Sequence, residues 1–171
     1  MSVGIDSMIL IYAGLAPVKA GGAQSEEYAD LCVRAKLLMH RLAREKVTVL
    51  LPTVAISEVL IPVPKSQKGA LIAAIQKRFV CPPFDVAAAS IAADIWSEHK
   101  KLPQDVQYCS RQVLRADVHI VASIYAAGGR EFYSHDEKCR ALASIVMKSY
   151  DLPTGDPEDM FLMDDIRRGD V

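Results

Sequence analysis

Short apolar segments of strand-like composition alternate with longer segments of helical periodicity along this chain, and that alternation is what most constrains its fold. Val3 to Ile5 predicts a buried strand, and Met8 to Tyr12 predicts a short helix after a turn. Glu26 to about Lys46 has the spacing of an amphipathic helix, and Val47 to Leu51 is typical of a fully buried parallel strand. Strands separated by helices predict a parallel sheet covered on both faces, which is a three-layer α/β sandwich.

The same alternation continues to about residue 150. Gly14, Pro17, Gly21 and Gly22 mark a flexible loop before the first long helix. Thr53 is expected to cap a helix that Pro62 and Pro64 end. Further helices are predicted at Ser66 to Lys77, Val86 to about Lys100, Val118 to Ala127 and a short segment closed by Ala141 to Ala143. Asp85 is expected to cap the second of these. Further strands are predicted at Phe79 to Cys81, Glu131 to Ser134 and Ile145 to Tyr150.

Length and composition favour one domain without a strong overall charge. The 171 residues are 51% hydrophobic, enough for one sizeable core, and 20 basic residues nearly balance 21 acidic ones. Residues 1–150 are expected to form the domain. Residues 151–171, which include Met160, Phe161, Leu162 and Met163, are expected to pack on that domain as a capping segment or to dock a second subunit.

The N-terminal apolar run has no basic stretch before it and is interrupted by Asp6, which argues against a signal peptide. No apolar stretch approaches the roughly 18 residues of a membrane span. We therefore expect a cytoplasmic protein with no membrane contact. Its cysteines form no Cys-x-x-Cys pair and are expected to be free, buried thiols: Cys32, Cys81, Cys109 and Cys139.

Four carboxylates stand where the predicted fold would bring them together. Asp6 and Asp136 follow strands, whereas Glu58 and Asp117 lie on apolar helical stripes. Each has an ordinary alternative, since Asp is common at turns and helix caps and Glu58 could lie at the margin of its stripe. Four converging carboxylates repel one another unless a cation neutralises them, and all-oxygen ligation suits magnesium or manganese.

The residues around these carboxylates resemble the ordered acidic motifs of PIN-domain nucleases. The resemblance rests on Ile5-Asp6-Ser7, Ile56-Ser57-Glu58-Val59, Ala116 to Ser123 and Tyr133-Ser134-His135-Asp136, and it spans residue 3 to about residue 150. It implies a PIN fold, a magnesium or manganese site lined by the four carboxylates, and hydroxyl groups beside it from Ser7 and Ser134. Many bacterial members are VapC-like toxins held inactive by an antitoxin, and homodimers are frequent, although this chain looks longer than the compact toxins.

Several other polar residues lie close in sequence to the proposed acids. Contacts to RNA phosphates could come from Arg115, Lys65, Lys68, Arg111 and Arg130, although solvated surface charge is the ordinary interpretation of each. His119 and His135 could act as general bases; His135 neighbours a strand exit, whereas His119 is expected to point away from the face of Asp117.

The sequence therefore predicts a metal-dependent ribonuclease in which Asp6 and Asp117 hold the principal ion and Glu58 and Asp136 complete the site. One alternative is a catalytically silent PIN-like module that binds RNA or protein. A second is a phosphatase of the HAD type, but the Asp-x-Asp motif of that family is absent because Met8 stands two residues after Asp6.

Overall fold

The centre of the molecule is a parallel sheet in the computed structural model, which describes residues 2–16, 25–108, 110–155 and 159–168. Its strands are β1 (Ser2–Ile5), β2 (Thr48–Leu50), β3 (Glu131–Tyr133) and β4 (Lys148–Tyr150), in the order β2-β1-β3-β4. Every neighbouring pair is parallel, and Gly4 of β1 pairs with Leu50 on one side and Phe132 on the other. The predicted α/β architecture is confirmed.

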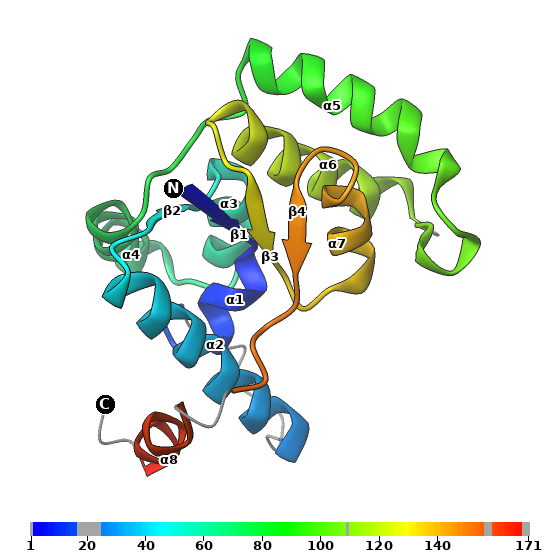
Figure 1. Cartoon of the computed structure of the whole chain (residues 1–171). Coiled ribbons are helices and arrows are strands. Elements are labelled where there is room, and N and C mark those ends of the chain that lie inside the picture. Colours follow the sequence, from blue (N-terminus) through cyan, green and yellow to red (C-terminus); the bar gives the residue numbers. More distant parts are fainter. Residues whose placement is uncertain (1, 17–24, 109, 156–158, 169–171) are drawn as a thin grey trace.

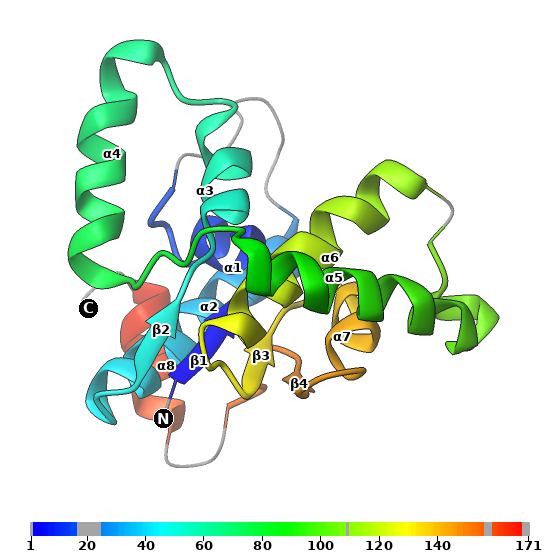
Figure 2. The same cartoon turned by 90° about the horizontal axis from the view of Figure 1, so that it is seen from above.

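Helices surround this sheet, with α4 and α5 at opposite sides of the molecule (Figure 1). Figure 2 shows α5 lying along α6, the helix against which it packs. The helices of the described residues are α1 (Ser7–Tyr12), α2 (Glu26–Arg44), α3 (Thr53–Leu60), α4 (Lys65–Arg78), α5 (Val86–Glu98), α6 (Arg111–Ala126), α7 (Glu137–Ala143) and α8 (Met160–Arg168), with 3-10 turns η1 (His99–Lys101) and η2 (Gln104–Val106).

The long helices α6 and α2 cover opposite faces of the sheet. Successive strand residues point to opposite faces, so Val49 faces away from the side that Gly4 and its partner Leu50 share. A Cβ atom at Gly4 would lie 2.4 Å from Cγ2 of Ile124, so α6 covers that side. Val49 lines a cavity together with Met39 of α2, so α2 covers the other. The result is the predicted three-layer arrangement.

Besides the predicted strand Ile145 to Tyr150, which begins only at Lys148, three local predictions differ from the structure. Thr53 is not a cap: it is the first residue of α3, Pro52 stands at the cap position, and the Thr53 N–H donates to the Pro82 carbonyl at 3.1 Å. The segment predicted as a strand at Phe79 to Cys81 makes only an isolated bridge, Val80 to Leu50, because the prolines that follow have no N–H to extend a ladder.

The third difference is the start of α6, which begins at Arg111, about two turns before the predicted Val118. Ser110 caps it by accepting a hydrogen bond from the Val113 N–H. Buried Leu114 extends the apolar stripe toward the N-terminus, but the charged residues interleaved with it hide the period in the sequence.

The C-terminal helix α8 packs against α2. Met163 and Ile166 are buried in a small apolar cluster with Val33 and Leu37, apart from the main core. Arg34 of α2 donates to the carbonyl oxygen of Leu152 at 2.5 Å and so fixes the chain that leads toward this helix. The division into a domain of residues 1–150 and an extension of residues 151–171 stays a prediction.

Within the residues that the structure describes, no helix combines the length and apolar character that a membrane crossing needs. Cys32, Cys81 and Cys139 are free thiols, as predicted, with Cys139 buried and the other two half-buried. Cys109 lies outside the described residues, as do Pro17, Gly21 and Gly22 of the predicted flexible loop.

Candidate acidic site

Two of the predicted carboxylates follow the neighbouring parallel strands β1 and β3, so they lie at one edge of the sheet. Asp6 is only 6% exposed and accepts a hydrogen bond from the Ile9 N–H at 2.9 Å, which caps α1. Asp136 is exposed and accepts from the N–H groups of Lys138 at 2.8 Å and Cys139 at 3.2 Å, which caps α7. Both residues are caps, and both also stand at the sheet edge.

Glu58 and Asp117 come from the two helices α3 and α6, which pack against each other. Both side chains are half-buried. Asp117 lies well inside α6, whose cap is Ser110, so the alternative interpretation of Asp117 as a helix cap is wrong.

Serine hydroxyls tie these carboxylates to the neighbouring elements. Ser134 is fully buried; its hydroxyl donates to Oδ2 of Asp6 and accepts from the Asp136 N–H at 3.0 Å. The Ser7 hydroxyl donates to Oε2 of Glu58 at 2.7 Å. The two hydroxyls that the family resemblance implied therefore contact two of the candidate acids.

The four carboxylates influence one another electrostatically. The pKa of Asp6 is raised to about 6, chiefly by burial; hydrogen bonds from Ser134 and the Ile9 N–H oppose this shift, and the nearby charges of Asp136 and Glu58 add to it. Burial likewise raises the pKa of Asp117 to about 7, with contributions from Asp136, Glu58 and Asp6. The fold thus brings Asp6, Glu58, Asp117 and Asp136 within electrostatic reach of one another, and we call them the acidic cluster.

The chemistry of the acidic cluster fits a hard divalent cation, because its donors are carboxylate and hydroxyl oxygens. Among the described residues, no group of three or more His, Cys, Asp and Glu side chains is arranged so that it could hold a metal ion. Magnesium commonly binds through one or two carboxylates and keeps several waters, so it does not need a preformed cage of protein ligands. The oxygen donors and the mutual repulsion of the carboxylates are the features that fit magnesium or manganese.

The basic candidates lie outside the acidic cluster. Arg111 and Arg115 line a shallow groove between α5 and α6 with Trp96 and Phe84, and both are exposed. Arg130 stands at the opposite end of β3 from Ser134 and donates to the carbonyl of Gly129 at 2.8 Å, so it does not reach the acidic cluster. Lys65 and Lys68 lie at the start of α4, after the helix that carries Glu58.

The two histidines considered as general bases, His119 and His135, have partners outside the acidic cluster. The ring of His119 packs on Phe84 with 4.2 Å between centroids; burial and then Arg115 lower its pKa, and it faces the α5–α6 groove. Nδ1 of His135 lies 3.1 Å from Oδ1 of Asp151. His119 therefore points away from the acids, as its spacing from Asp117 predicted.

Two residues beside the cluster, Cys139 and Tyr108, are not among the site residues that the sequence predicts. Cys139 is buried; burial and then the charge of Asp117 raise the pKa of its thiol well above the ordinary value. Tyr108 directs a buried hydroxyl toward Asp117. Cys139 follows the capping Asp136 by one helical turn, which could have suggested its position, but Tyr108 lies in an irregular segment that has no periodicity to place it.

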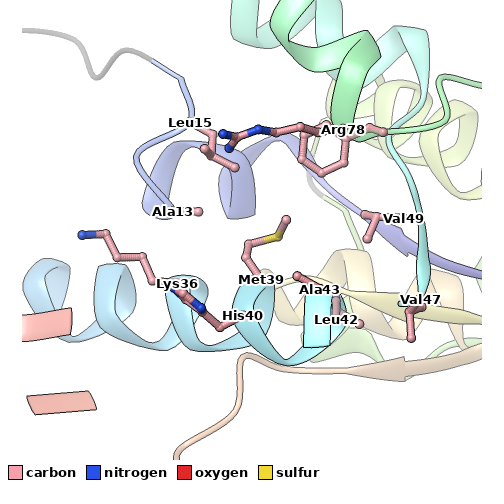
Figure 3. Close-up of a pocket in the computed structure, with 11 residues that line it drawn as sticks. Ala13, Leu15, Lys36, Met39, His40, Leu42, Ala43, Val47, Val49 and Arg78 are labelled. Atoms are coloured by element: carbon pink, nitrogen blue, oxygen red, sulfur yellow. The ribbon is translucent and has the colours of Figure 1, made fainter. Parts of the chain in front are cut away.

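A cavity lies elsewhere in the described residues, beside β2 (Figure 3). Its volume is about 670 Å³, and it lies between the end of α1, the middle of α2 and the end of α4. Among the described residues the walls are mostly apolar, the charged or titratable side chains are Lys36, His40 and Arg78, and no Asp or Glu lines the cavity. We call it the β2 cavity; it contains no member of the acidic cluster.

Comparison with known proteins supports the fold. No family model and no curated protein matches the sequence. A chain of the crystal structure of VapBC2 from Rickettsia felis bound to a DNA fragment from their promoter is similar in structure, with a TM-score of 0.59 and 13% sequence identity. The match covers 90% of this chain and 100% of that chain. At this identity the likeness concerns the fold alone, and the fold it indicates is PIN-like.

Proposed function

We propose that this protein is a metal-dependent ribonuclease that hydrolyses phosphodiester bonds at the acidic cluster. The observation that carries the proposal is the convergence of Asp6, Glu58, Asp117 and Asp136 from separate elements, close enough to affect one another's ionisation. Carboxyl groups with raised pKa values near the carboxyl ends of parallel strands favour a functional site over a set of unrelated helix caps. The likeness to a chain of the VapBC2 structure supports the fold that this function needs.

In this proposal Asp6 and Asp117 are the principal ligands of a magnesium or manganese ion, and Glu58 and Asp136 complete the site or orient water. A bound ion would lower the pKa of water and stabilise the extra charge on the phosphoryl group. Ser134 and Ser7 hold Asp6 and Glu58 through their hydroxyl groups. Holding a ligand in one orientation is the usual role of such hydrogen bonds.

RNA is the proposed substrate, and exposed basic residues outside the acidic cluster supply the contacts to its backbone. Arg115 is the first candidate, because it stands two residues before Asp117 on α6 and lines the α5–α6 groove, where its exposed guanidinium is available to a phosphate of RNA bound along that groove. We place this activity in the cytoplasm.

The test is cleavage of end-labelled RNA and of single-stranded DNA by wild type, Asp6→Asn, Asp117→Asn and, as a matched control, Asp94→Asn, whose side chain is exposed on α5. We expect cleavage of RNA with magnesium or manganese and none with chelator. Each cluster variant should lose at least about 100-fold in rate, because it removes a ligand of the ion. The Asp94 variant should cut like wild type. A fully active Asp6→Asn would sink the assignment.

A catalytically silent module is the second candidate. It is favoured by one observation: no metal-holding arrangement of three or more ligating side chains exists among the described residues. Such a module would bind RNA or protein without cutting. Metal-dependent cleavage by wild type that is lost in Asp6→Asn excludes it.

We further propose that the chain is a VapC-like toxin that forms homodimers and is held inactive by an antitoxin protein. The structural likeness to a chain of VapBC2 supports a protein partner. The β2 cavity is our candidate for its docking place, because apolar walls and three basic side chains, Lys36, His40 and Arg78, complement an apolar segment flanked by carboxylates.

A further inference from the structure

Tyr108 places a buried hydroxyl beside the acidic cluster. Its ring packs against the main core. Its hydroxyl oxygen is buried and has no hydrogen-bond partner of normal geometry among the described residues. Buried hydroxyl groups nearly always have a partner, so an exception next to four carboxylates calls for an explanation.

The candidate partner is Asp117, whose carboxylate interacts with this hydroxyl. The Tyr108 hydroxyl lies close enough to the Asp117 carboxylate to lower its pKa, although the geometry falls short of a formed hydrogen bond. A tyrosine hydroxyl carries its proton at neutral pH, so the Tyr108 hydroxyl can serve a carboxylate only as a donor.

The segment that carries Tyr108 is tied to its surroundings. The preceding residue, Gln107, donates through Nε2 to the carbonyl oxygen of Leu102 at 2.7 Å. The turn η2 packs beside α7, the helix that Asp136 caps. The hydroxyl is thus held at the cluster by the fold rather than by a contact with the acids.

We propose that Tyr108 is a positioning residue of the acidic cluster: its hydroxyl donates to one oxygen of Asp117 and holds the other oxygen toward a bound divalent cation. The inference rests on the proposed function, because it assigns a partner to one of the proposed metal ligands. Hydrogen bonds that orient a ligand commonly change metal affinity by 10-fold to 100-fold when they are removed.

The experiment is a titration of metal-free, full-length protein with Mn²⁺, followed by the electron paramagnetic resonance signal of the free ion. Tyr108→Phe removes only the hydroxyl. The matched control is Tyr28→Phe, because the Tyr28 hydroxyl is also buried without a hydrogen bond of normal geometry among the described residues, and the side chains that affect its pKa are Cys32 and Tyr12 rather than any of the four acids. We expect the Kd for Mn²⁺ to rise about 10-fold in Tyr108→Phe and to stay at the wild-type value in Tyr28→Phe.

RNA cleavage gives a second measurement. The Mn²⁺ concentration for half-maximal rate should rise about 10-fold in Tyr108→Phe, and the rate at saturating Mn²⁺ should return close to that of wild type. An unchanged Kd overturns the inference, and so does equal weakening in both variants. An unchanged Kd with a lower saturating rate would instead mean that the hydroxyl contacts substrate. Wild type that binds no Mn²⁺ would overturn the proposed function as well, so the two failures are distinguishable.

Discussion

At the scale of single residues, the acidic cluster shows how position decides the behaviour of a carboxylate. Asp6 and Asp117 have raised pKa values chiefly because they are buried, and their negative neighbours add to the shift. Asp151, which follows β4, behaves in the opposite way, because hydrogen bonds from His135 and the Leu152 N–H, together with the charge of Arg140, outweigh its burial and lower its pKa. The fold therefore leaves Asp6 and Asp117 without the counter-charge that it gives to Asp151.

This difference predicts how the stability of the metal-free protein depends on pH. A carboxyl group whose pKa is higher in the folded than in the unfolded state holds its proton more tightly when folded, so its contribution is lost as pH rises. Stability should fall over the pH range from about 4, the pKa of an aspartate in the unfolded chain, to about 7, the pKa of Asp117 in the folded protein. Asp151 has a lowered pKa and is ionised throughout the upper part of this window, so it does not offset the loss.

We expect the free energy of unfolding in urea, with chelator present, to fall by about 1–3 kcal/mol between pH 5 and pH 8. Asp117→Asn should be more stable than wild type at pH 8, on the order of 1 kcal/mol, because the amide carries no charge. The Asp94→Asn control should follow wild type. Equal stability of wild type and Asp117→Asn at pH 8 would contradict the electrostatic account.

At the scale of elements, the close approach of α6 to the sheet depends on Gly4. A Cβ atom there would lie 2.4 Å from Cγ2 and 2.6 Å from Cδ1 of Ile124, a side chain with no exposed surface. Gly4→Ala should therefore cost about 1–3 kcal/mol of stability, since Ile124 cannot move without displacing the core. The approach matters for the site, because the same helix carries Asp117.

The matched control is Gly69→Ala in α4, where a Cβ atom would meet nothing within 4 Å. It should leave stability unchanged or raise it by up to about 1 kcal/mol, because alanine favours the helix. Urea unfolding measures both variants. A Gly4→Ala protein as stable as wild type would mean that α6 can withdraw from β1 without cost.

Much of the element order was predictable because strand and helix periods differ clearly in this sequence, as Val3 to Ile5 and α2 show. The start of α6 was not, because its first two turns mix Leu114 with charged residues. The cap at Pro52 was missed because a neighbouring threonine is the commoner choice. The position of Asp6 and Asp136 followed from strand exits, whereas that of Tyr108 depends on tertiary contacts of an irregular segment.

At the scale of the whole molecule, the acidic cluster and the β2 cavity are built from different parts of the fold. The cluster stands at the exits of β1 and β3 and on α3 and α6, whereas the cavity lies between α2, β2 and the last turn of α4 (Figure 3). The element that connects them is α1. Asp6 caps one end of this helix, and Ala13 at its other end lines the cavity. A protein that occupies the cavity therefore need not displace the cluster's own side chains.

The cavity predicts binding of an amphipathic, acidic helix. We would measure the fluorescence anisotropy of a labelled helical peptide with a leucine face flanked by glutamates, and of the same peptide with lysine in place of glutamate. Only the acidic peptide should bind, because Lys36 and Arg78 stand at the cavity and none of the described residues that line it is an Asp or Glu. The double variant Lys36→Glu/Arg78→Glu should weaken binding at least about 10-fold, since it replaces attraction with repulsion.

The control Lys65→Glu/Lys68→Glu makes the same change of charge at the start of α4, outside the cavity, and should bind like wild type. Equal binding of both peptides, or equal loss in both double variants, would mean that the cavity recognises no acidic helix and that a partner docks elsewhere.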